Sequence, residues 1–308
     1  MRRSTRRAPV RSRPWALLEV FLRRGRLPAL DSRPGDGRLA LVTASRRGGR
    51  RPLGQHFLRN PRTVERILAA LGASAGDTVV EIGPGTGALT RPLLSRGVRV
   101  VAVEADAGLS ARLLAELAER GLVVVEGDAR AVDPGPALRQ AGAAPPVPLV
   151  GNLPYESATP MVRAFVRRPD LYARLVVMVQ REVAERLVAA PGSDAYGFLS
   201  VDVAAHAAAR LLFGVPPRDF APAPRVFSAV VELVPHPPEP GTAGALALAS
   251  AGFASRRKTL LNALSAVHDR EAVRRAIASA GLPEDVRAET LGLPELRALA
   301  ARLVPGGS

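Results

Sequence analysis

The 308-residue sequence predicts an α/β fold, with a mostly parallel sheet and a small helical domain at its C-terminal end. Three observations predict it. Between residues 60 and 190, short apolar runs alternate with segments of helical periodicity, as in sheets whose strands are joined by helices. A glycine-rich turn, residues 83–87, directly follows one apolar run. Beyond residue 240 only helical periodicity remains.

The composition excludes several classes of protein. A hydrophobic content of 47% supports a sizeable core, and no apolar run approaches the length of a membrane-spanning helix. With 0 Cys, disulfides, thiolate metal sites and cysteine nucleophiles are excluded. The 4 His show no metal-ligand spacing, so no metal is expected. The formal net charge of +15 suggests a nucleic-acid partner.

That charge is concentrated in the first part of the chain. Residues 1–51 hold 15 Arg and 3 acidic residues, and so carry +12 of the +15. We expect a basic, low-order extension: an organellar transit peptide, an RNA-binding arm, or, as we prefer, a dispensable tail or a stretch upstream of the true start. A proline-rich linker, residues 235–240, then divides the rest into domains at 52–235 and 241–308.

The elements can be predicted in order. Asn60 and Pro61 form an N-cap and first-turn pair for a helix that continues to Leu71. Parallel strands are expected at residues 78–82, 98–103, 122–125, 147–150 and 175–180. Helices are expected from the glycine turn to residue 94 and over residues 159–165, 181–189 and 198–207. An antiparallel pair is expected at residues 209–215 and 228–234.

The glycine turn and two acidic residues predict a nucleoside-cofactor site. Gly83-Pro84-Gly85-Thr86-Gly87 lets the backbone approach a ligand, and Glu104, at the end of the second strand, suits a ribose diol. The spacing GxGxG, unlike GxGxxG, favours S-adenosylmethionine over a dinucleotide. Asp128 follows the third strand, where it can accept from an adenine amino group. The alternatives are a tight turn and an acid that caps the next helix.

The stretch Gly151-Asn152-Leu153-Pro154-Tyr155 leaves the fourth strand at the same edge of the sheet. An ordinary turn is one interpretation. The other is a clamp for an adenine amine: the Asn152 side-chain oxygen and a main-chain carbonyl near Leu153 or Pro154 accept its hydrogens, and Tyr155 stacks on the base. Positioning is then the main catalytic device.

Together these segments resemble the KsgA-type ribosomal RNA adenine-N6,N6-dimethyltransferases, from about Leu53 to about Leu303. The matching segments are residues 54–58, 81–87, 127–129, 152–155, 180–187, 191–193, 196–197, 220–224 and 256–260. The resemblance implies a Rossmann-like class I methyltransferase domain, residues 52–235, and a small helical domain, residues 241–308.

The resemblance also implies the site residues. The S-adenosylmethionine contacts are expected from Gln55, His56, Leu58, Gly83, Gly85, Glu104, Asp128 and Asn152. The catalytic set is Asn152, Leu153, Pro154, Tyr155 and Phe220, in which Phe220 packs on the target base opposite the tyrosine; from the residues alone, Phe220 reads as a loop anchor. RNA phosphate is expected at Arg256, Arg257 and Lys258, which otherwise read as a solvated helix face.

Four positions depart from the family pattern. His56 stands where Asn is frequent, Asn60 where Asp is common, Glu156 where Asn is frequent and Phe227 where Asp is common. Glu156 adds a negative charge near the expected RNA entrance. None of the four changes Asn152, Pro154 or Tyr155.

The activity implied is methyl transfer to N6 of two adjacent adenosines in the 3′-terminal hairpin loop of small-subunit rRNA. The partner would be the 30S subunit precursor, without a membrane, and we expect a cytoplasmic monomer. One alternative is a related large-subunit methylase that confers macrolide resistance. Others are a non-enzymatic assembly or transcription factor on the same fold and, more distantly, a dinucleotide-dependent oxidoreductase.

Overall fold

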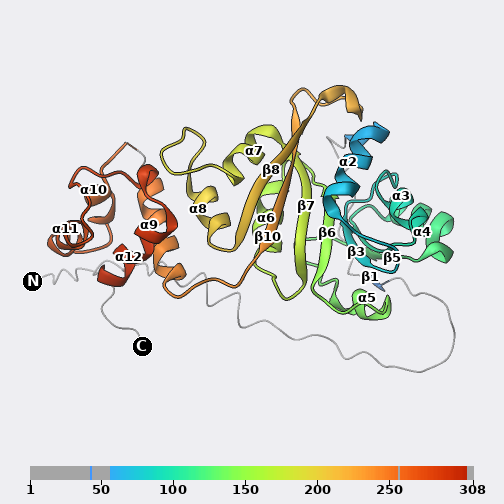
Figure 1. Cartoon of the computed structure of the whole chain (residues 1–308), viewed down its shortest axis with the longest axis horizontal. Coiled ribbons are helices and arrows are strands. Elements are labelled where there is room, and N and C mark those ends of the chain that lie inside the picture. The colour runs from blue at the N-terminus through green and yellow to red at the C-terminus, as the bar shows by residue number, and fades with distance from the viewer. Residues whose placement is uncertain (1–41, 44–55, 256, 304–308) are drawn as a thin grey trace, which may run out of the picture. The chain divides into compact units, whose positions relative to one another are not determined.

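An eight-stranded sheet forms the centre of the fold. The computed structural model describes residues 42–43, 56–255 and 257–303. The strands lie in the order β1-β5-β4-β3-β6-β7-β10-β8 (Figure 1). Neighbours from β1 to β7 are parallel, whereas β10 is antiparallel to both β7 and β8. The predicted α/β fold with a mostly parallel sheet is therefore confirmed.

The elements have the following bounds. The strands of the large sheet are β1 (Val42–Thr43), β3 (Thr78–Ile82), β4 (Arg99–Glu104), β5 (Leu122–Glu126), β6 (Val147–Asn152), β7 (Tyr172–Gln180), β8 (Ala207–Val215) and β10 (Ser228–Pro235). A separate two-stranded sheet pairs β2 (Phe57–Leu58) with β9 (Phe220–Ala221). The helices up to residue 204 are α2 (Pro61–Leu71), α3 (Thr90–Ser95), α4 (Ala107–Leu117), α5 (Gly135–Gln140), α6 (Ala158–Phe165), α7 (Arg181–Leu187) and α8 (Phe198–Ala204).

Each face of the sheet is covered by its own hydrophobic core. Successive strand residues point to opposite faces, so Val79 packs with α2, α3 and α4 whereas Val80 packs with α5, α6 and α7. Because both faces are covered, every residue of β3 is buried. This explains why the strands read as continuous apolar runs in the sequence.

Helix α2 forms as its sequence predicts. The Asn60 side chain accepts a hydrogen bond from the Arg62 N–H at 3.0 Å, and Pro61 occupies the first turn, where its missing donor is not needed. The helix ends at Gly72, whose φ of 68° is left-handed. Its buried residues recur at helical spacing: Val64, Ile67, Leu68 and Leu71.

Some boundaries differ from the prediction, and one difference affects the site. Strand β6 continues through Gly151 to Asn152, so the asparagine is the last residue of a strand and not part of a turn. It continues because Gly151 and Asn152 still pair with β7, and Pro154, which lacks a donor, follows. The helix after the glycine turn begins only at Thr90.

The C-terminal part is helical within the described residues, with α9 (Thr242–Phe253), α10 (Leu260–Leu264), α11 (Arg270–Ser279) and α12 (Leu293–Leu303). These helices share a third core, to which α8 and the preceding loop contribute Val201 and Tyr196. The predicted domain boundaries stay a prediction. Strand β1 lies inside the predicted extension and pairs with β5, which the sequence did not indicate. No helix of the described residues is long and apolar enough to cross a membrane.

Candidate functional site

The candidate site lies at the carboxyl edge of four adjacent strands. Asp128 follows β5, Glu104 ends β4, Gly83 follows β3 and Asn152 ends β6. These strands are parallel neighbours in that order, so their carboxyl ends meet at one edge. Ligands bind at this edge in open parallel sheets. The sheet therefore brings together the acids, the glycine turn and the amide that the sequence singled out.

The turn between β3 and α3 presents backbone without side chains. Gly85 has a φ of +56°, which favours glycine. A Cβ at this residue would lie 2.9 Å from the Phe57 ring, so any other side chain would displace that ring. The Gly83 N–H donates to the Val103 carbonyl at 2.9 Å, which fixes the start of the turn against β4.

The Glu104 carboxylate is buried and held by backbone donors. Its Oε2 accepts from the Gly85 N–H at 3.1 Å and its Oε1 from the Asp106 N–H at 3.0 Å, and only 5% of the residue is exposed. A carboxylate has about four acceptor positions. Each oxygen therefore keeps one position for a ligand hydroxyl, which suits the predicted diol contact.

A second buried acid, Glu81, lies in β3 just before the glycine turn. Burial raises its pKa from 4.5 to about 7, the Thr90 hydroxyl that donates to it at 2.7 Å lowers the pKa, and the charge of Glu104 raises it further. Near neutral pH, Glu81 is therefore partly protonated. The sequence reading assigned no role to this residue.

Asp128 is engaged with its own loop. Its Oδ1 accepts from the Arg130 N–H and Nε, both at 2.9 Å, and the guanidinium also reaches Oδ2. These hydrogen bonds lower the pKa of Asp128. The geometry matches the alternative of a loop acid, and the adenine contact stays a prediction.

Asn152 is oriented by a residue almost 100 positions earlier. Its Nδ2 donates to the His56 carbonyl at 2.8 Å. A carbonyl can only accept, so the atom of the Asn152 amide that faces it must be the nitrogen. The amide oxygen, Oδ1, therefore points away from the His56 carbonyl. The His56 ring is held in turn, since its Nδ1 donates to the Pro222 carbonyl at 2.7 Å. The His56 backbone and side chain thus link the end of β6 to the loop after β9.

Tyr155 is fixed at both its ring and its hydroxyl. The hydroxyl lies 2.7 Å from the Oγ of Ser228, which is fully buried. The His56 ring lies beside it, with 5.6 Å between the ring centroids and an interplanar angle of 32°. Burial raises the pKa of Tyr155 and the hydrogen bond to Ser228 opposes the shift. Tyr155 is therefore a neutral, half-buried ring of fixed orientation.

Phe220 lies in a core and not in an open site. It pairs with Leu58 across the two-stranded β2–β9 sheet, and 5% of it is exposed. It packs in the core that covers the α2 face of the large sheet, and so does Leu58. This is the anchoring role expected from its residues alone, and contact with a target base stays a prediction.

Asp219 is a residue at the site that the sequence reading missed. Its carboxylate is 4% exposed and accepts from Asn60 Nδ2 at 2.9 Å and from Thr63 Oγ1 at 2.6 Å. Its carbonyl also accepts from the Arg59 N–H at 2.8 Å. Asp219 thus ties the start of α2 to β9. The N-cap pattern at Asn60 was the only local signal, and it did not reveal the distant carboxylate.

The predicted RNA-binding residues are only partly within the described part of the chain. Arg256 lies outside the described residues, and so does Gln55, which was predicted to contact the cofactor and not RNA. Arg257 and Lys258 are exposed, on a turn between α9 and α10 and not on a helix as expected. The helix begins at Leu260 because the Thr259 hydroxyl caps it, accepting from the Asn262 N–H at 3.3 Å.

Solved structures share this fold. A dimethyladenosine transferase from Plasmodium falciparum superposes with a TM-score of 0.64 at 23% identity, over 79% of this chain and 96% of that chain. The 23S rRNA methyltransferase ErmE superposes with a TM-score of 0.63 at 24% identity, over 80% of this chain and 99% of that chain. These likenesses show a shared fold, the Rossmann-like fold of the two methyltransferases.

Sequence comparison gives the family. The family model described as ribosomal RNA adenine dimethylase matches residues 46–294, and the chain belongs to this family. The ribosomal RNA small subunit methyltransferase A of Methylococcus capsulatus is 42% identical over 260 residues, which are 83% of this chain and 98% of that protein. The protein of the same name from Kineococcus radiotolerans is 42% identical over 267 residues, 83% of this chain and 86% of that protein. The resemblance seen in the sequence is confirmed.

Proposed function

We propose that this methyltransferase transfers methyl groups from S-adenosylmethionine to N6 of two adjacent adenosines in the 3′-terminal hairpin loop of small-subunit rRNA. The observation that carries the proposal is the orientation of Asn152. Its donor end is committed to the His56 carbonyl, so its acceptor end is free to receive an amine hydrogen. It stands at the strand edge where Gly83 and Glu104 would bind the methyl donor.

The residues at the edge fit S-adenosylmethionine. The Glu104 carboxylate has one free acceptor position on each oxygen, which matches a ribose diol. The turn at Gly83 and Gly85 has no side chain that would stand between its backbone and a ligand. When bound, S-adenosylmethionine supplies a methyl group on a positively charged sulfur. His56 is one of the predicted cofactor contacts. Its carbonyl accepts from the Asn152 amide nitrogen, and its ring Nδ1 donates to the Pro222 carbonyl.

The hydrogen bonds within the loop support one choice of the two amine acceptors. The Pro154 carbonyl accepts from the Ser157 N–H at 3.0 Å and from the Ser157 hydroxyl at 3.5 Å, so both of its acceptor positions are engaged. Within the described residues, no donor is recorded for the Leu153 carbonyl. The Leu153 N–H donates to the Met178 carbonyl at 3.0 Å, which holds the residue in place. Asn152 Oδ1 and the Leu153 carbonyl are therefore the pair that would accept the two N6 hydrogens.

These acceptors make the adenine amine a better nucleophile. Its lone pair is conjugated with the ring, and hydrogen bonds to both hydrogens favour the pyramidal form in which the lone pair is available. In the transfer, the new carbon–nitrogen bond forms as the carbon–sulfur bond breaks. The nitrogen then loses a proton to solvent, and a second round gives the dimethyl product. Tyr155, fixed by Ser228, would stack on the base and hold it in line.

The choice of small-subunit RNA is supported by the relatives, which are named ribosomal RNA small subunit methyltransferase A at about 42% identity. The fold does not decide it, because a 23S rRNA methyltransferase superposes about as well. The exposed Arg257 and Lys258 are available to phosphate. A monomeric state and a cytoplasmic location stay predictions.

The test is methylation of unmethylated small subunits with labelled S-adenosylmethionine, followed by digestion and identification of the nucleosides. We expect N6,N6-dimethyladenosine in the small-subunit RNA. Asn152→Ala should lower kcat by about 10²- to 10³-fold, the effect of losing one preorganised hydrogen-bonding group. Its dissociation constant for S-adenosylmethionine should change far less. Asn262→Ala, a remote asparagine on α10, is the matched control.

Two results would contradict the proposal. Absence of dimethyladenosine from the small subunit would remove the proposed activity, and label in large-subunit RNA would favour the resistance methylase. A variant at Asn152 that loses cofactor binding but keeps its turnover at saturation would show that the amide serves the cofactor and not the target amine.

A further inference from the structure

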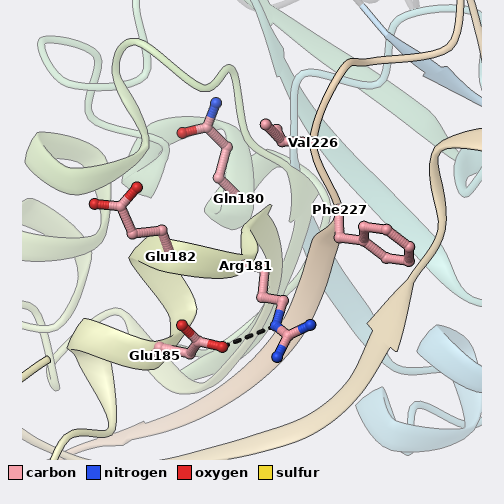
Figure 2. A pocket seen from close by; sticks show the side chains of 6 residues that line it. All are labelled: Gln180, Arg181, Glu182, Glu185, Val226 and Phe227. Carbon is pink, nitrogen blue, oxygen red and sulfur yellow. Dashed lines mark hydrogen bonds and ion pairs between the residues drawn. The ribbon is translucent and has the colours of Figure 1, made fainter. Parts of the chain in front are cut away.

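The large aromatic residue Phe227 is exposed, and it directly precedes Ser228, the partner of the Tyr155 hydroxyl. Phe227 is 53% exposed and its neighbour Val226 is 44% exposed, on the segment between β9 and β10. They line one side of an open groove whose other side is the start of α7. Figure 2 shows Phe227 and Val226 on one side, Glu182 and Glu185 on the other, and Gln180 at one end of the groove.

The backbone of this segment is fixed to the catalytic loop. The Phe227 carbonyl accepts from the Arg181 N–H at 2.9 Å, and the next residue, Ser228, pairs with Gln180 in the sheet. Ser228 is also the partner of the Tyr155 hydroxyl. The backbone of Phe227 is therefore held at the start of β10. Phe227 directly precedes Ser228, whose hydroxyl orients Tyr155. A nucleotide next to a base stacked on Tyr155 would lie within reach of this groove.

The charges around the groove suit a nucleotide. Its two acids are paired within α7: Glu185 accepts from Arg181 at 2.8 Å and Glu182 from Arg186 at 2.7 Å. Arg225, two residues before Phe227, is exposed, and no hydrogen bond or ion pair joins it to another described residue. An unpaired guanidinium two residues along the chain from an exposed ring offers one contact to phosphate and one to a base.

We propose that Phe227 is a stacking platform for the unpaired nucleotide that neighbours the target adenosine, with Arg225 on its phosphate and the Gln180 carboxamide at the base edge. Within the described residues, no hydrogen-bond partner is recorded for the Gln180 side chain, so both its donor and its acceptor are available. The occupant is single-stranded RNA because Phe227 directly precedes Ser228, which holds the Tyr155 ring proposed to stack on the target base. This inference rests on the proposed function and adds a second base-binding position to it.

The test compares variants of the full-length protein in the small-subunit methylation assay. Phe227→Ala should raise KM for the small subunit about 5- to 140-fold, the range of one base–aromatic stack, with little change in kcat or in S-adenosylmethionine affinity. Phe227→Trp should restore KM, because a larger ring also stacks. Arg225→Gln should reduce the salt dependence of RNA binding by about one unit of slope. Val267→Ala, at a residue 64% exposed in the C-terminal helical part, is the control for loss of a surface apolar group.

The outcomes separate this inference from the proposed function. If the wild type methylates small subunits but Phe227→Ala has an unchanged KM, the stacking platform is wrong and the proposed function stands. If Phe227→Ala changes the molecular mass in solution and not the KM, the ring serves association between copies, which also overturns the inference. If the wild type methylates no adenosine, the proposed function itself fails. Thermal unfolding of each variant confirms that it is folded, since an exposed ring contributes little to the core.

Discussion

Replacing Glu81 with Gln should make the stability of the protein less dependent on pH. Glu81 is 1% exposed, and its carboxyl has a pKa of about 7 in the folded chain against 4.5 for the ordinary group. The folded state thus binds this proton more tightly than the unfolded state. The stability that the protonated group contributes is complete below pH 4.5 and is lost as the pH rises through about 7.

The two pKa values give the magnitude. Ionisation of Glu81 destabilises the folded protein by about 1 kcal/mol at pH 5 and about 3 kcal/mol at pH 8. The wild type should therefore lose about 2 kcal/mol across this range through Glu81 alone. Glu81→Gln stays neutral, and its side-chain oxygen can still accept from the Thr90 hydroxyl. Its advantage over the wild type should grow by up to about 2 kcal/mol, or about 4–8 °C in melting temperature.

The assay is thermal unfolding of both proteins from pH 5 to pH 8 at constant ionic strength. Subtracting the wild type at each pH removes the titration of groups that both proteins share. Glu116→Gln is the control, because Arg91 and Arg112 hold the pKa of Glu116 below 4.5 and it stays ionised throughout. A difference between Glu81→Gln and the wild type that is constant with pH would refute the reasoning.

Two further predictions concern the contacts that hold the site. Tyr155→Phe should destabilise the protein by about 1–3 kcal/mol, because it leaves the fully buried Ser228 hydroxyl without its partner. Adding Ser228→Ala should recover most of this loss in denaturant unfolding; additive losses would mean that the hydrogen bond is not the cause. Asp219→Asn should weaken S-adenosylmethionine binding in a titration, because an amide nitrogen cannot accept from Asn60 or Thr63 and the β2–β9 sheet loses its anchor. Unchanged affinity in a correctly folded Asp219→Asn would show that the sheet does not position the cofactor site.

Much of the fold could be predicted because its signals are local. The helix from Pro61 is encoded by its own cap and its apolar spacing, and the parallel strands by apolar runs between helical segments. Boundaries were less accurate where pairing decided them. Strand β6 extends to Asn152 because Asn152 still pairs with Met178 of β7. The residues around Asn152 are typical of turns, so the sequence does not indicate that pairing.

The cofactor side of the candidate site could also be read from the sequence. Gly83, Glu104, Asp128 and Asn152 follow successive strands, and parallel strands necessarily place their carboxyl ends at one edge. Their detailed partners could not be read in this way. The sequence does not show that Asp128 is paired with Arg130, or that Phe220 is 5% exposed in a core.

The sequence alone determined the α/β class, the family and the chemistry of the sheet edge, because each can be recognised from short segments of residues that are neighbours along the chain. Only the tertiary structure decided how the edge is held. His56 bonds to Pro222 across 166 positions and to Asn152 across 96, and Asp219 bonds to Thr63 across 156. Such contacts depend on how separate segments pack against one another, which no local pattern encodes. One of them, the bond from Asn152 to the His56 carbonyl, turns the amide oxygen of Asn152 toward the proposed amine.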